Sequence, residues 1–279
     1  MLLKQILVPL DGSVLADRVL LHLRRLLLRK DTNVLLLRVI DEAPPRHGEE
    51  RGFAGAHLDD QRRRLESLGA RVETRIAKGD PAAEILRCAA ERPPSLIAMS
   101  THGRSGFDRW IWGTVAERLL REAQQPLFLL NPRALPEATH ANEGGFKRIL
   151  APIDGSEIGA TVLPLVSTIA RLYESEVVLF HAAPPAEATT AVEEEAIASL
   201  NRHRKELEAQ GLRARVEMRT ESAAIAILDA AEAEEVDLVA MTAHGSSGSA
   251  RWAFGSVAEK VLRHAPCPIL VKRGAGRVE

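Results

Sequence analysis

This chain of 279 residues has few of the features that mark secreted, membrane or nucleic-acid-binding proteins. Its two cysteines, Cys88 and Cys267, form neither a metal-binding pattern nor a disulfide framework. No apolar run approaches the roughly 18 residues of a membrane span, and the first apolar stretch is too short for a signal peptide. The net charge of −1 gives no general attraction for nucleic acid or anionic lipid. We therefore expect a cytoplasmic protein with no nucleic-acid or membrane partner.

The sequence does contain an internal repeat. The stretch from Lys4 to Ser13 recurs as Lys147 to Ser156, at an offset of 143 residues, and a second stretch recurs at an offset of 142 residues. Between the copies, residues 131–145 are polar and rich in proline and glycine, which is typical of a linker. We predict a duplicated domain, with a first half over residues 1–133, a linker over 134–145 and a second half over 146–279.

Apolar runs alternate with helical patterns through each half. In the first half, strands are expected at Ile6–Leu10, Val34–Ile40, Arg71–Ala77, Leu96–Met99 and Leu127–Leu130. Expected helices start after Ser13 and run to about Leu28, cover Asp59–Leu68, follow Asp80 to about Glu91, and start at Thr114; Asp41 to about Leu58 is expected to be a loop. The second half repeats this order.

Strict alternation of strand and helix predicts an α/β fold: in each half, a five-stranded, doubly wound, Rossmann-like parallel sheet. Ligands of such sheets bind beyond the carboxyl ends of the strands, where the strand order reverses. Asp11, Val39 and the Ser100–Gly103 segment follow strand ends in the first half, and Asp154, Ala182 and Thr242–Gly245 do so in the second.

The second repeated stretch joins a buried strand to a helix. Nine residues separate Gly103 from Gly113-Thr114, and nine separate Gly245 from Gly255-Ser256. Glycines at these positions and at Gly106 let backbone N–H groups approach an anion, and hydroxyls or a cation add donors at Thr114, Ser256, Arg104 and Ser246. The loop lacks the Walker lysine, and the first turn lacks the dinucleotide fingerprint. The pattern therefore favours a phosphate site of another kind.

Simpler interpretations of the same residues stay open. Thr114 with Glu117, and Ser256 with Glu259, match a capping box that only satisfies the helix itself. Asp11 and Asp154 suit a ribose hydroxyl or a bound Mg²⁺, but equally a turn that each carboxylate stabilises through its own backbone. His102 is expected to brace its loop rather than act as a general base.

Together these motifs resemble the universal stress protein family in its tandem form. The resemblance covers both halves almost end to end, and the Val257–Val271 segment is very similar to that family. Nucleotide-binding members carry Gly-x2-Gly, nine residues, then Gly followed by Ser or Thr, which matches Ser100 to Thr114 and Thr242 to Ser256 in spacing. The resemblance implies ATP with Mg²⁺ as ligands in at least one half, the first being favoured for its Gly79-Asp80 loop.

The resemblance also implies which residues bind. Adenine falls to Pro9, Leu10, Val39 and Met99, the ribose and metal side to Asp11, and the phosphates to Gly103, Arg104, Gly113, Thr114 and Val115. Ser100 and Gly106 complete the first-half set. In the second half the corresponding residues are Pro152, Ile153, Asp154, Ala182, Met241, Thr242, Gly245, Ser246, Gly255, Ser256 and Val257, with Asp154 on the metal side.

Two departures from the family pattern bear on this prediction. The first motif glycine is Ser100 in one half and Thr242 in the other, which would be strained if the backbone required a positive φ. Thr220-Glu221-Ser222 also replaces the glycine-containing loop of the first half, and a carboxylate there disfavours a polyanion.

The resulting hypothesis is a stress-response module that binds ATP and regulates or interacts with an unidentified protein, with little or no turnover. The alternatives are a nucleotide-free scaffold of the same fold and a slow ATP hydrolase. The family resemblance also predicts that Leu127–Leu130 and Ile269–Lys272 pair with each other as an internal pseudo-dimer. A homodimer of the whole chain is compatible with the sequence.

Overall fold

A computed structural model describes residues 4–27, 32–40, 50–91, 96–102, 113–131, 134, 145–186, 189–243 and 255–274. These residues divide into two compact units, one up to residue 131 and the other from residue 145, with Ala134 in the second. Among them, no helix combines the length and apolar character needed to cross a bilayer.

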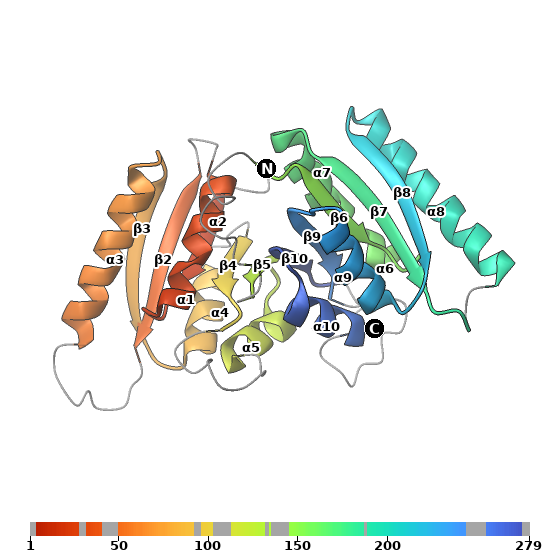
Figure 1. The fold of residues 1–279 in the computed structure, drawn as a ribbon. Helices are drawn as coiled ribbons and strands as arrows, with labels where there is room; N and C mark the ends of the chain where they lie inside the picture. The colour runs from red at the N-terminus through yellow and green to blue at the C-terminus, as the bar shows by residue number, and fades with distance from the viewer. Residues whose placement is uncertain are drawn as a thin grey trace. The chain divides into compact units, whose positions relative to one another are not determined.

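The first unit alternates strands and helices in chain order (Figure 1). Its elements are β1 (Gln5–Pro9), α1 (Val14–Asp17), α2 (Val19–Leu26), β2 (Asn33–Ile40), α3 (Glu50–Glu66), β3 (Arg71–Lys78), α4 (Pro81–Glu91), β4 (Leu96–Ser100), α5 (Thr114–Glu122) and β5 (Leu127–Leu130).

The second unit repeats this order. Its elements are β6 (Arg148–Pro152), α6 (Glu157–Ala160), α7 (Leu163–Tyr173), β7 (Glu176–Ala183), α8 (Thr190–Ala209), β8 (Arg213–Thr220), α9 (Ala223–Ala233), β9 (Leu238–Thr242), α10 (Ser256–His264) and β10 (Ile269–Lys272).

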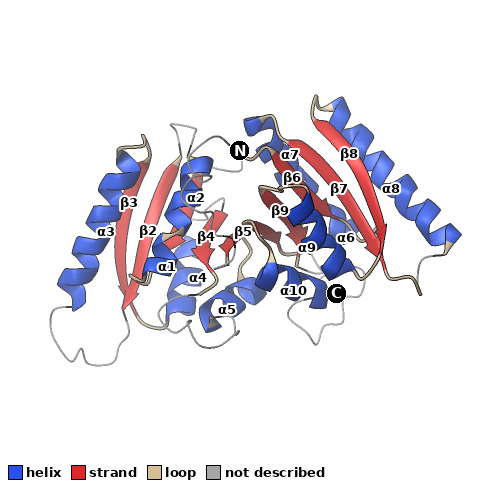
Figure 2. Ribbon diagram, viewed as in Figure 1, coloured by secondary structure: helices blue, strands red, loops and turns tan. Residues whose placement is uncertain are grey.

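Each unit is a parallel sheet flanked by its helices (Figure 2). The strands of the first unit lie in the order β3-β2-β1-β4-β5, and those of the second in the order β8-β7-β6-β9-β10. The predicted doubly wound α/β fold is therefore confirmed. In the first unit the order reverses between β1 and β4, which pair through Ile6–Leu96 and Leu7–Ile97. Beyond these two pairs lies the edge of the sheet formed by the carboxyl ends of the strands, where the predicted ligand residues follow.

Burial explains why these segments are strands. All five residues of β4 and of β9 are buried, as expected for central strands covered on both faces. No residue of the edge strands β3 and β8 is fully buried, and both strands carry arginine, glutamate and lysine or threonine. Charged edge strands of this kind resist pairing with other chains.

Two helix predictions were wrong in extent. The helix expected from Ser13 to about Leu28 is broken at Arg18 into α1 and α2, although Ser13 caps it by accepting from the Ala16 amide at 3.1 Å. Residues 50–58, expected to be loop, are the first half of α3, where Ala54 and Leu58 are buried. Residues 41–49 of the expected loop lie outside the described residues.

Candidate functional site

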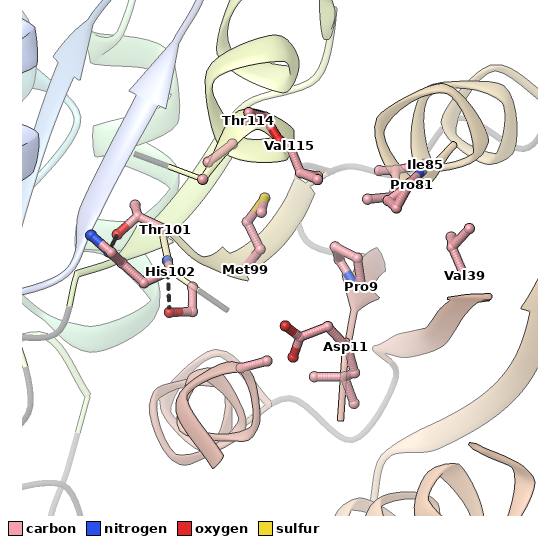
Figure 3. A pocket seen from close by; sticks show the side chains of 15 residues that line it. Pro9, Asp11, Val39, Pro81, Ile85, Met99, Thr101, His102, Thr114 and Val115 are labelled. Atoms are coloured by element: carbon pink, nitrogen blue, oxygen red, sulfur yellow. Dashed lines mark hydrogen bonds between the residues drawn. The ribbon is translucent and has the colours of Figure 1, made fainter. Parts of the chain in front are cut away.

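A cavity of about 220 Å³ opens at the carboxyl ends of β1 and β4 (Figure 3). Figure 3 shows Met99 between the start of α5 and Asp11, with Val39, Pro81 and Ile85 across the cavity from His102. The full lining consists of Pro9, Leu10, Asp11, Ala16, Val39, Pro81, Ile85, Met99, Ser100, Thr101, His102, Gly113, Thr114, Val115 and Ala116.

The cavity brings together most of the site residues proposed for the first half. These are Pro9, Leu10, Asp11, Val39, Met99, Ser100, Gly113, Thr114 and Val115. Gly103, Arg104 and Gly106 lie outside the described residues. Sequence reasoning missed Pro81 and Ile85, one turn apart on α4; the helix start predicted after Asp80 is the signal in the sequence for this wall of the cavity.

Asp11 stabilises the turn after β1. Its Oδ1 accepts a hydrogen bond from the Ser13 amide at 2.9 Å, and in the second unit Asp154 Oδ1 accepts from the Ser156 amide at 3.1 Å and the Ser156 hydroxyl at 2.6 Å. The turn-stabilising interpretation of both aspartates thus describes a real interaction. Asp11 is also the single carboxylate among the lining residues, and the described residues hold no group of three metal-ligating side chains. A metal ion here would need most of its ligands from elsewhere.

The start of α5 is open toward the cavity because its N-cap has no side chain. The N-cap is Gly113, whose carbonyl accepts from the Glu117 amide at 3.2 Å. Thr114 is therefore the first helical residue, and no side chain of the described residues caps the helix; Gly255 and Ser256 repeat this arrangement in α10. The capping-box interpretation of Thr114 and Ser256 is wrong.

The first amides of α5 have no i−4 carbonyl within the helix. Thr114, Val115 and Ala116, which carry these amides, all line the cavity. Together with the helix dipole, N–H groups at this position favour an anion.

Gly113 packs tightly against the end of β4. Its amide donates to the Thr101 carbonyl at 3.2 Å, and a Cβ at Gly113 would lie 3.3 Å from that same oxygen. Gly255 stands in the same relation to the Ala243 carbonyl, with a hydrogen bond of 3.1 Å and the same 3.3 Å approach. The glycine therefore permits close approach of the helix start to the strand end in both units.

Ser100 and Thr242 occupy the first motif-glycine position without backbone strain. Neither is among the non-glycine residues with positive φ, which in the described part of the chain are Glu174 and Glu235. The Ser100 hydroxyl accepts from the His102 amide at 3.4 Å. A side chain here is thus compatible with the fold, and in the first unit its oxygen lies next to an amide at the edge of the cavity.

His102 is hydrogen-bonded to the residue before it, whereas the loop that we expect it to brace continues outside the described residues. Its Nδ1 lies 2.9 Å from the Thr101 hydroxyl, which also lies 3.3 Å from the Leu130 carbonyl of β5. Figure 3 shows the His102 side chain on the far side of Thr101 from Met99 and Asp11. The imidazole is therefore tied to the strand end. In the second unit Ala243 replaces Thr101 and has no hydroxyl.

The second unit places its corresponding residues at the same edge of its own sheet. Pro152 ends β6, with Ile153 and Asp154 directly after it; Ala182 lies in β7, Met241 and Thr242 end β9, and Gly255, Ser256 and Val257 start α10. Gly245 and Ser246 lie outside the described residues. Two side chains are smaller than their first-unit counterparts, since Ala182 replaces Val39 and Ala223 replaces Pro81.

The sequence model described as the universal stress protein family matches residues 3–131 and again residues 145–273. Universal stress protein MJ0531 of Methanocaldococcus jannaschii is 30% identical over 142 residues, covering 46% of this chain and 82% of that protein. Universal stress protein MJ0577 of the same organism is 26% identical over 155 residues, covering 46% of this chain and 94% of that protein. The crystal structure of a universal stress protein from Archaeoglobus fulgidus has a TM-score of 0.77 and 22% identity, with 98% of this chain and 99% of that chain covered. This last likeness extends the shared fold over both units.

Proposed function

This chain belongs to the universal stress protein family, and on that premise we propose that it binds an adenine nucleotide, ATP, in the cavity of its first half. The observation that carries the proposal is the combination of an apolar slot with an uncapped helix start in one cavity. Val39, Ile85 and Met99 supply an apolar surface suited to a purine, and the amides of Thr114 and Val115, at the start of α5, are suited to a phosphate. Asp11 lines the same cavity, and its carboxylate could accept a hydrogen bond from a ribose hydroxyl.

Mg²⁺ enters this proposal only with the nucleotide. Mg²⁺ is usually held by one or two carboxylates together with substrate phosphates, and Asp11 is the carboxylate available in the cavity. Asp154 has the corresponding position in the second half. Bound there, the ion would neutralise phosphate charge.

We further propose a nucleotide-dependent regulatory role in stress response with little turnover. Asp11 and His102 are the titratable side chains among the described lining residues, and each is hydrogen-bonded within its own segment, to the Ser13 amide and the Thr101 hydroxyl respectively. The alternative of a nucleotide-free scaffold is favoured if Thr114 and Ser256 act only as caps and if Ser100 and Thr242 close the pocket. The first of these conditions is not met in α5 and α10.

Thermal unfolding with and without Mg²⁺–ATP tests the proposal. A ligand that binds the native state stabilises it by mass action and so raises the melting temperature. The stabilisation is about 2.7 kcal/mol when the free ATP concentration is one hundred times Kd. Val39→Trp, which fills the apolar slot, should remove the first-half contribution. An unchanged melting temperature at millimolar ATP, together with no adenine nucleotide released from denatured protein, would overturn it. Phosphate release well above that of a Gly113→Val, Gly255→Val double variant would instead support a slow hydrolase.

We also propose that β5 and β10 pair antiparallel in an internal pseudo-dimer. Both strands are short and apolar, and such strands need a covered edge. Hydrogen exchange tests this, because pairing would protect amides of Leu127–Leu130 and Ile269–Lys272 on both edges of each strand. Rapid exchange along one edge of each would contradict it.

A further inference from the structure

Arg38 in β2 is a buried charged residue that the proposed binding site does not itself use. It is only 9% exposed, and its Nη1 donates to the Leu10 carbonyl at 3.3 Å. Its neighbour Val39 lines the cavity, so strand alternation directs Arg38 to the opposite face of the sheet. Arg38 therefore contacts the backbone behind the cavity rather than the cavity itself.

In the second unit a different side chain makes the corresponding contact. His181 in β7 stands at the position of Arg38, because Pro152 pairs with Phe180 as Pro9 pairs with Leu37. It is also 9% exposed, and its Nδ1 lies 2.8 Å from the carbonyl of Ile153, the counterpart of Leu10. Arginine and histidine differ in length, shape and charge, and what they share here is an N–H donor aimed at one carbonyl.

That carbonyl belongs to the peptide leading into the site aspartate. The Leu10 amide donates to the Leu37 carbonyl at 2.8 Å, and the Ile153 amide donates to the Phe180 carbonyl at 2.8 Å. Strand β2 thus holds the residue before Asp11 from both sides, by its backbone at the amide and by the Arg38 side chain at the carbonyl. This fixes the direction in which the chain enters the turn.

From these contacts we infer that Arg38 and His181 are positioning residues for the Asp11 and Asp154 turns. Each acts through the carbonyl of Leu10 or Ile153, and the property required at the position is the N–H donor rather than the charge. Burying a guanidinium is costly, and the hydrogen bond to the Leu10 carbonyl offsets part of that cost. The consequence for ligand affinity rests on the nucleotide-binding function proposed above.

Exchanging the two side chains between the halves tests this inference. Arg38→Met keeps a long side chain but removes the donor, whereas Arg38→His supplies the donor used by the second half. In full-length protein carrying Ala182→Trp to fill the second-half slot, ATP binding is measured by calorimetry. We expect Arg38→Met to weaken ATP binding about tenfold and Arg38→His to stay within about twofold of the parent. The same comparison is made in the second half, in protein carrying Val39→Trp to fill the first-half slot. There His181→Phe removes the donor and His181→Arg supplies the donor used by the first half.

Hydrogen exchange of the Asp11–Ala16 segment provides a readout that needs no ligand. Exchange should accelerate in Arg38→Met and return to the parent rate in Arg38→His. Equal loss of affinity in both variants, or parental affinity in Arg38→Met, would overturn the inference. If the parent protein binds no ATP, the proposed function fails, and unchanged exchange in Arg38→Met would then overturn the positioning role separately. If Arg38→Met does not fold, the His181 pair decides.

Discussion

The guanidinium of Arg118, in α5, lies 2.7 Å from Asp80 Oδ1, the same oxygen that accepts a hydrogen bond from the Ala83 amide at 2.8 Å. One carboxylate therefore caps α4 and ties it to α5, the two helices that supply Pro81 and Thr114 to the cavity. The second unit has Ser222 and Lys260 at these positions, and no side chain of the described residues caps α9.

Removing Asp80 should therefore cost more than removing its counterpart. We expect Asp80→Ala to lower the free energy of unfolding by about 1 kcal/mol through loss of the cap, with less than about 1 kcal/mol more from the exposed ion pair. Arg118→Ala should lose only the contribution of the ion pair and leave the cap intact. Ser222→Ala is the matched control and should leave stability unchanged within about 0.5 kcal/mol. Calorimetric unfolding of the three variants measures this, and a Ser222→Ala cost equal to that of Asp80→Ala would refute it.

Acid should reduce the contribution that the surface carboxylates of α4 make to the stability of the fold. Hydrogen bonding and charge from Arg87 hold the pKa of the Glu84 carboxyl below its ordinary value of 4.5, and Arg75, with Arg87, does the same to the pKa of Glu91. Because these pKa values are depressed by folding, their contribution to stability is complete above about pH 5 and declines as the pH falls through the folded values. Arg87→Gln should make the loss of melting temperature between about pH 5 and pH 3 shallower. Parallel pH profiles for the variant and the parent would contradict this.

Local chemistry predicted much of this fold from the sequence. Asp80 followed by Pro81 predicts the helix start that α4 shows, because capping and the fixed φ of proline act within a few residues. Strand ends were also predicted closely, because each buried strand coincides with a continuous apolar run. The candidate site residues lie at one edge of the sheet because the carboxyl ends of parallel strands lie together there. The alternation of strands and helices in the sequence is sufficient to predict this arrangement.

What the sequence could not predict depends on contacts between distant residues. The Thr114 to Glu117 spacing favours Thr114 as N-cap, but the Glu117 amide bonds the carbonyl of Gly113, which is held against Thr101. Gly52 and Gly55 lower helix propensity in the segment where burial of Ala54 and Leu58 nevertheless supports α3. The partner of Arg38 is likewise 28 residues away in sequence, and no local pattern indicates it.

Two glycines should respond in opposite ways to alanine. At Gly113 a Cβ would lie 3.3 Å from the Thr101 carbonyl, so Gly113→Ala should lower the free energy of unfolding by about 1 kcal/mol and weaken ATP binding by displacing the helix start. At Gly52 in α3 a Cβ meets nothing within 4 Å, so Gly52→Ala should raise stability by about 0.5–1 kcal/mol. Urea unfolding and ATP titration of both variants check this. A stabilising Gly113→Ala would show that the close approach is unimportant.

Ser100→Gly should lower the stability of the fold and tighten ATP binding. The serine hydroxyl accepts from the His102 amide at the cavity edge, so glycine would free that donor for a phosphate oxygen. Glycine in the buried strand β4 also loses more conformational freedom on folding, at a cost of about 1 kcal/mol. We expect a lower melting temperature without ligand and ATP binding several-fold tighter, measured by calorimetry in the Ala182→Trp background. Thr242→Gly, with Ala182→Trp retained, should lower stability similarly without changing first-half affinity. Weaker ATP binding by Ser100→Gly would show that the hydroxyl itself supports the ligand or its loop, and the restored glycine would then be no advantage.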